Sequence, residues 1–267
     1  MTTKYDIKSR LKEYFPIIFE LIEENNLDWR TIEKRFGEKL DEHIKKFELT
    51  GQPIRVEASL YHIITASKEG KDEATRLLDF ITKLFQELIA RLDKEEKKLI
   101  KKNIFDLLTN IDMKYLNFLG ELCVLNQVKR NTKLKLLATE QPLDKNKKDG
   151  TKIDFVFFNA DSDRKLLVEI VNLHINDNVT GTDNKIETLL DQKIKGKLNR
   201  KGIRTTYEFL LIPVVWGLID DIKRLIQYYE TYQPQFKNTS IPVCFMTFSD
   251  GVGNRVHKFG TIDTILK

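Results

Sequence analysis

Two acidic residues on either side of a short polar turn are the residues of this chain whose types and spacing suggest chemistry. Asp154 precedes the turn NADSDR (159–164), and Glu169 follows it. If Asn159 pairs with Arg164 across the turn, Asp154 and Glu169 become antiparallel partners. Their Cβ atoms then lie about 5 Å apart on one face of a sheet.

Two carboxylates placed in this way predict a metal site. Both are flanked by apolar residues, Ile153 and Phe155 around one and Val168 and Ile170 around the other. Like charges side by side in an apolar sheet are destabilising, and a divalent cation between them removes the repulsion. Hard oxygen ligands select Mg²⁺ or Mn²⁺ over zinc. The simpler interpretation is that this spacing of Asp and Glu arose by chance on an exposed hairpin.

The hairpin resembles that of the PD-(D/E)XK nuclease superfamily, which has the restriction-endonuclease-like fold. The resemblance covers roughly residues 113–250 and consists of Glu121 in a preceding helix, Asp154 at the end of a strand and Glu169 on its hairpin partner. It implies that Asp154, Glu169 and the backbone carbonyl of Ile170 bind Mg²⁺, with Glu121 as an outer ligand. It also implies hydrolysis of phosphodiester bonds.

The chain departs from this superfamily at the lysine that positions the attacking water. That lysine is expected two residues after Glu169, where this chain has Val171. The hairpin register places Lys152 opposite Val171, so Lys152 is the first candidate for a relocated lysine. Lysines from the following helix are also known in the superfamily, which makes Lys193 the second candidate. The third interpretation is a site without a lysine, and hence an inactive one.

Three clusters of basic residues flank the hairpin in the chain and predict contacts with nucleic acid. They are Lys129, Arg130, Lys133 and Lys135; then Lys145, Lys147, Lys148 and Lys152; then Lys193, Lys195, Lys197, Arg200, Lys201 and Arg204. Such side chains bind phosphates irrespective of base sequence, with an affinity that falls as salt rises. We expect the last two clusters to contact nucleic acid, DNA rather than RNA, although a solvated lysine-rich surface would have the same composition.

The elements that must position these residues change in type near residue 113. Apolar spacings of three and four predict helices over 5–24, 28–47, 72–92, 94–111 and 114–128. Segments rich in β-branched and aromatic residues predict strands at 132–140, 151–159, 164–175, 207–217 and 241–251, an edge strand at 255–262, and helices at 182–200 and 219–232. The expected fold class is therefore α/β, with a helical domain (1–112) before a restriction-endonuclease-like mixed-sheet domain (113–267, α-β-β-β-α-β-α-β).

Composition narrows the class of protein. The chain has 45 Lys and Arg against 40 Asp and Glu, and residues 114–267 hold 24 of these cations against 18 of the anions. That part therefore has the sign that attracts polyanions. Two isolated cysteines, Cys123 and Cys244, argue against a disulfide scaffold and a cysteine-based zinc site. Without a signal-peptide core or an apolar run of about 20 residues, we expect a soluble, cytoplasmic protein without a membrane span.

These observations together predict a metal-dependent nuclease, expected to be a DNA endonuclease with a role in restriction or defence. The alternative is an inactive nuclease fold that serves as a nucleic-acid-binding or protein-interaction module. The near-neutral helical domain, with 21 cations and 22 anions over residues 1–113, suits a homodimer contact or a protein partner. The sequence contains no Gly-rich phosphate loop and no nucleophile motif of a Ser/His/Asp triad.

Overall fold

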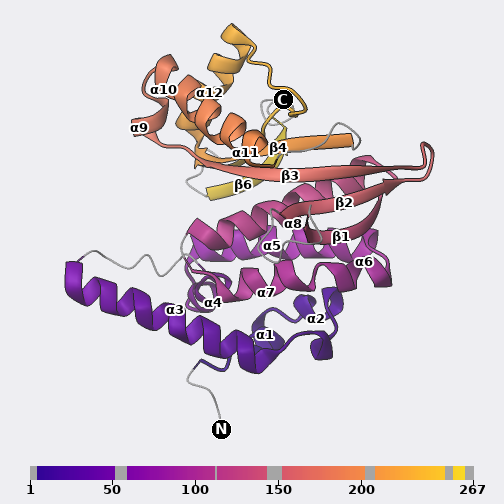
Figure 1. The fold of residues 1–267 in the computed structure, drawn as a ribbon. Coiled ribbons are helices and arrows are strands. Elements are labelled where there is room, and N and C mark those ends of the chain that lie inside the picture. Colours follow the sequence, from indigo (N-terminus) through magenta and orange to yellow (C-terminus); the bar gives the residue numbers. More distant parts are fainter. Residues whose placement is uncertain are drawn as a thin grey trace. The chain divides into compact units, whose positions relative to one another are not determined.

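The computed structural model describes residues 5–51, 59–111, 113–142, 152–201, 208–249 and 255–261 (Figure 1). The chain divides into two compact units, which we call the helical unit (Met1–Arg130) and the sheet unit (Asn131–Lys267). The helix predicted over residues 114–128 thus belongs with the helical unit, although the expected domain boundary lay before it. In the described part, no helix is both long enough and apolar enough to span a membrane.

The helical unit consists of short and medium helices. Their bounds are α1 (Ile7–Tyr14), α2 (Ile17–Leu21), the 3₁₀ turn η1 (Glu24–Asn26), α3 (Trp29–Thr50), α4 (Leu60–Lys68), α5 (Asp72–Arg91), α6 (Lys94–Leu99), α7 (Lys101–Thr109) and α8 (Met113–Asn131). Two stretches predicted as single helices are interrupted. Pro16 separates α1 from α2, because a proline inside a helix removes a hydrogen bond and clashes with the preceding turn. Ile100 separates α6 from α7.

Local signals in the sequence set the ends of two helices that carry residues discussed below. The Asp28 side chain accepts a hydrogen bond from the Thr31 N–H at 3.0 Å and so begins α3. Gly51, with φ of 66°, ends it in the left-handed conformation that glycine adopts most easily. Asp93 and Glu96 form a capping box that begins α6. These contacts satisfy backbone groups that the helices leave free.

The sheet unit contains one six-stranded mixed sheet. Its strands are β1 (Lys135–Pro142), β2 (Lys152–Asn159), β3 (Arg164–His174), β4 (Glu208–Leu218), β5 (Val243–Ser249) and β6 (Arg255–Thr261). They lie side by side in chain order. The β1–β2, β2–β3 and β5–β6 pairs are antiparallel, whereas β3–β4 and β4–β5 are parallel. Mixed α/β architecture is therefore confirmed, and each parallel pair is joined by a helical crossover.

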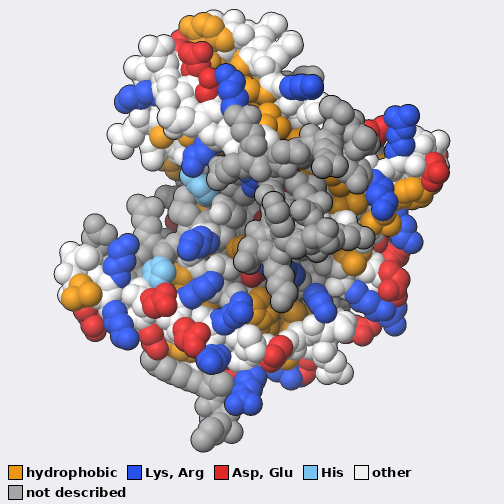
Figure 2. Space-filling model, in the orientation of Figure 1, with side chains coloured by type: hydrophobic (Ala, Val, Ile, Leu, Met, Phe, Trp, Pro, Cys, Tyr) orange, Lys and Arg blue, Asp and Glu red, His pale blue; other side chains and the backbone are white. Residues whose placement is uncertain are grey.

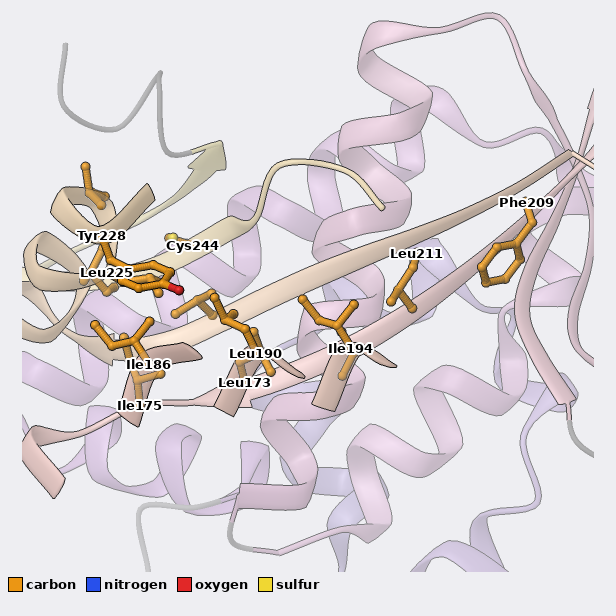
Figure 3. Packing of buried hydrophobic residues seen from close by; sticks show 14 of the residues in the cluster. Leu173, Ile175, Ile186, Leu190, Ile194, Phe209, Leu211, Leu225, Tyr228 and Cys244 are labelled. Carbon is orange, nitrogen blue, oxygen red and sulfur yellow. The ribbon is translucent and has the colours of Figure 1, made fainter. Parts of the chain in front are cut away.

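Helices of the sheet unit lie on one side of β3 and β4 (Figure 1). They are α9 (Asp177–Thr180), α10 (Asp183–Leu190), the π-helical segment η2 (Asp191–Lys195), α11 (Gly196–Lys201) and α12 (Ile219–Tyr232). Figure 3 shows the buried cluster between them and the sheet, in which Ile186, Leu190 and Ile194 of the crossover helix lie along Leu173 and Leu211 of the strands. Burial of these side chains fixes the crossover helix on the face that also carries Glu169.

Close packing beside the end of β4 depends on a glycine. A Cβ atom placed on Gly217 would lie 2.6 Å from Cγ1 of Ile175, which follows β3 directly. The Ile175 N–H also donates to the Trp216 carbonyl at 2.8 Å, so the two segments continue to pair beyond the end of β3. No side chain fits at position 217 unless Ile175 moves.

Candidate functional site

The β2–β3 hairpin brings the two predicted carboxylates together. Asn159 pairs with Arg164, which is the register expected from the turn, and the described ladder runs as far as Phe155 opposite Val168. In this register the next residues of the two strands, Asp154 and Glu169, face each other across the hairpin.

Side-chain hydrogen bonds replace the ladder at this point. The Ile170 N–H donates to Asp154 Oδ2 at 2.7 Å, and the Asp154 N–H donates to Glu169 Oε2 at 3.3 Å. Each carboxylate is therefore bonded to the backbone beside the other one. Charge-assisted hydrogen bonds of this kind hold both side chains in defined positions.

A lysine from the crossover helix compensates the buried carboxylate. Glu169 is fully buried, with 0% of its side chain exposed, and Asp154 is half-buried. Lys197 of α11 places Nζ 2.7 Å from Glu169 Oε1, and 28% of the lysine side chain is exposed. A buried carboxylate is costly without a partner of opposite charge, so this ion pair anchors α11 to β3.

Sequence reasoning assigned Lys197 to phosphate contacts rather than to the site. A signal for its inward position is nevertheless present in the sequence. Ile186, Leu190 and Ile194 recur at intervals of four and are all buried, and Lys197 follows three residues after Ile194. Residues three or four apart share one face of a helix, so Lys197 continues the face that packs on the sheet.

The segment η2 interrupts the α-helix just before Lys197. It spans Asp191–Lys195 and follows the hydrogen-bond pattern of a π-helix, with a wider turn than an α-helix. In an α-helix, a stripe repeating every four residues rotates by about 40° at each step. The wider turn counters that rotation, so that Ile194 and Leu198 still pack against the core.

The two lysines proposed from the sequence take other positions. Lys152 lies 3.7 Å from Glu140 Oε2, with 47% of its side chain exposed. Lys193 is exposed and forms no ion pair among the described residues. Burial, followed by the nearby charge of Lys193, lowers the pKa of His174. Val171, at the usual lysine position, is buried in the core beneath the helices.

Sequence reasoning overlooked a third acidic residue beside the pair. Thr139 pairs with Phe155 and Gln141 with Ile153, so Glu140 of β1 occupies the register position opposite Asp154. Its φ of 49° is unusual for a residue other than glycine and interrupts the regular strand. The sequence gave no signal for this conformation.

Glu121, the expected outer ligand, lies in α8 of the helical unit. It is 8% exposed, in a stretch of that helix where residues 119–125 are all buried. The Asn103 side-chain amide donates to Glu121 Oε2 at 2.8 Å. The structure thus describes Glu121 in its own unit, whereas Asp154, Glu169, Ile170 and Lys197 come from the sheet unit.

The remaining predicted phosphate contacts are only partly described. Lys195 is paired with Asp191 at 2.6 Å on the surface of η2. Arg200 and Lys201 lie in α11, but their side chains fall outside the described part. Lys145, Lys147, Lys148 and Arg204 lie outside the described residues altogether.

The donor set at the hairpin suits a hard divalent cation. Two carboxylates and a neighbouring backbone carbonyl offer the oxygen ligands that Mg²⁺ and Mn²⁺ prefer. Within the ranges that the structure describes, no three His, Cys, Asp or Glu residues are grouped as metal ligands. The protein would therefore supply few ligands, as is common for Mg²⁺, which retains several waters.

Comparisons with known proteins add no family to this description. No protein-family model, no curated protein and no solved structure matches the chain.

Proposed function

We propose that the protein is a metal-dependent nuclease that hydrolyses phosphodiester bonds in nucleic acid, with DNA as the expected substrate. The observation that carries the proposal is the convergence of Asp154, Glu169 and Lys197 on one face of the hairpin, with the lysine 2.7 Å from the buried carboxylate. Acidic residues beside a lysine are the residue types that the PD-(D/E)XK resemblance implies. Here the lysine comes from the crossover helix.

The arrangement of elements supports the restriction-endonuclease-like part of the proposal. Helix α8, the antiparallel strands β1, β2 and β3, a helical crossover and the parallel strand β4 follow in the order that the resemblance implies. Asp154 and Glu169 lie on the second and third of these strands. A fold alone does not define a function, so the proposal rests on the side chains that the fold positions.

The residues of the site have distinct roles in this proposal. Asp154, Glu169 and the Ile170 carbonyl would hold Mg²⁺ or Mn²⁺, which when bound would activate water and neutralise charge on the leaving oxygen. Lys197 orients the Glu169 carboxylate through their ion pair. Its ammonium also adds positive charge where a phosphodiester accumulates negative charge during hydrolysis.

One observation favours the alternative, an inactive nuclease fold that binds nucleic acid or protein. Val171 occupies the usual lysine position and is 6% exposed within the core, so no lysine fits there. In that interpretation, Lys197 only stabilises Glu169. The two functions differ in whether removing the lysine abolishes cleavage or merely weakens the fold.

A cleavage assay with matched variants tests the proposal. Supercoiled plasmid, linear duplex and RNA are incubated with protein and Mg²⁺ or Mn²⁺, with chelator in parallel. We expect cleavage by the wild type and by Lys195→Met, which removes an exposed lysine from the same helix. Cleavage by Asp154→Asn and Lys197→Met should fall by a hundredfold or more, on the order of the loss when one electrostatic stabiliser is removed.

Circular dichroism at the assay temperature shows whether each variant is folded. If folded Asp154→Asn cleaves as fast as the wild type, the activity does not come from this site. If no metal ion supports cleavage of any of these substrates, the nuclease proposal fails and the binding-module alternative takes its place.

A further inference from the structure

A second cluster of charge lies in the helical unit, away from the residues used above. Arg35 and Lys39 belong to α3, and Lys114 belongs to α8. None of the three forms an ion pair among the described residues. We call Arg35, Lys39 and Lys114 the cation cluster.

Neutral groups, rather than acids, hold two members of the cation cluster in place. The Arg35 guanidinium lies over the Phe105 ring at 5.2 Å, and Lys39 Nζ donates to Asn110 Oδ1 at 2.5 Å. The Asn110 amide in turn donates to the Asp106 carbonyl at 2.7 Å. An aromatic ring and an amide position a cation without cancelling its charge. Both cations therefore remain available to an anion.

The members of the cation cluster act on one another. The pKa of Lys39 is lowered, first by burial, and the charges of Lys114 and Arg35 lower it further. Asp106 and Glu42 act in the opposite direction. Asp106 is already paired with Lys102, so Glu42 remains as the acid facing three cations.

We propose that the cation cluster binds the phosphates of a nucleic-acid backbone. Arginine and lysine are the residues that recognise phosphate, and arginine does so with two parallel hydrogen bonds. Arg35 and Lys39 lie about 6 Å apart along α3, given the rise of a helix. This proposal does not depend on the nuclease activity of the sheet unit.

The setting of the cation cluster favours a polymer over a small phosphate compound. Arg35 and Lys114 are exposed and Lys39 is half-buried, so the three lie on an open surface. A pocket of this unit lies elsewhere and is lined by residues of α2 and α6, including Leu21 and Lys97. Figure 2 shows cationic side chains interspersed with acidic ones on the visible surface, so an unpaired group of three cations is a local feature.

The test measures binding in chelator, where metal-dependent cleavage cannot occur. Fluorescent single-stranded and duplex oligonucleotides are titrated with the full-length protein at several salt concentrations. The test variant carries Arg35→Gln, Lys39→Gln and Lys114→Gln. The control variant carries Lys8→Gln, Lys71→Gln and Lys98→Gln, which removes three lysines that are already paired with acids.

We expect the test variant to bind about tenfold more weakly, with a salt dependence reduced by about two units, because each phosphate contact contributes about 0.7 to 0.9. The control variant should bind like the wild type. Equal loss in the two variants, or none in either, would overturn the proposal. So would competition by inorganic phosphate that is as effective per phosphate as unlabelled oligonucleotide. Failure of the nuclease proposal changes none of these outcomes, because no arm of the experiment measures cleavage.

Discussion

Replacing Lys197 by Met tests the physical basis of the site independently of any activity. Methionine retains the apolar stem of the lysine but leaves Glu169, with 0% exposure, without its cation. Removing one partner of a buried ion pair costs about 3–5 kcal/mol. Because 28% of the Lys197 side chain is exposed, water screens part of the interaction, and we expect a loss of about 2–4 kcal/mol in the free energy of unfolding.

The measurement must report on the sheet unit alone, since a chain of two units need not unfold in one step. The chain has two tryptophans, and Trp216 lies in β4 with 4% exposure while Trp29 lies in the helical unit. In a Trp29→Phe background, fluorescence during urea unfolding therefore follows the sheet unit. The free energy of unfolding is obtained by linear extrapolation to zero urea.

Two further variants in the same background control this measurement. Lys195→Met removes an exposed pair with Asp191, and we expect a change below about 0.5 kcal/mol. The double variant Lys197→Met/Glu169→Gln carries no unpaired buried charge, so it should regain at least half of the loss. If Lys197→Met is as stable as Lys195→Met, Lys197 does not compensate Glu169 and the reasoning is refuted.

Two other predictions concern packing and pH. Gly217→Ala should destabilise the sheet unit by about 1–3 kcal/mol, because its Cβ would lie 2.6 Å from Ile175 Cγ1; urea unfolding should show partial rescue by Ile175→Ala, and no rescue would contradict the steric cause. Burial lowers the pKa of His62 below its ordinary 6.5, so the unfolded state binds more protons below that pH. The helical unit should therefore lose stability between about pH 7 and about pH 5, and less so in His62→Gln, as urea unfolding at both pH values would show.

The hairpin was predictable because its determinants are local. A polar turn with Asn159 and Arg164 at its ends fixes the register, and the register places Asp154 opposite Glu169. The lysine was harder to predict, because its position depends on the rotation of a helix far along the chain from the hairpin. The basic cluster offered several lysines, and only the apolar stripe ending at Ile194 singles out Lys197.

Tertiary contacts determined what the sequence left open. The unusual φ of Glu140 has no marker in the sequence, because neither glycine nor asparagine stands there. Helix α8 has apolar residues on every side and reads equally well as part of either unit, so the unit boundary could not be placed from its pattern. The interruption at Pro16, by contrast, follows from the chemistry of proline and was available from the sequence.

The π-helical segment also bears on how this chain can vary in length. A turn closed by i→i+5 hydrogen bonds holds about one residue more than an α-helical turn. Loss of one codon within Asp191–Lys195 would therefore leave an ordinary α-helix, with Lys197 and Leu198 still turned toward the sheet. Loss of one codon in α10, upstream of this segment, would instead rotate everything that follows by about 100°. Of these two stretches of the crossover helix, η2 is the one that tolerates a one-residue deletion without moving the lysine away from Glu169.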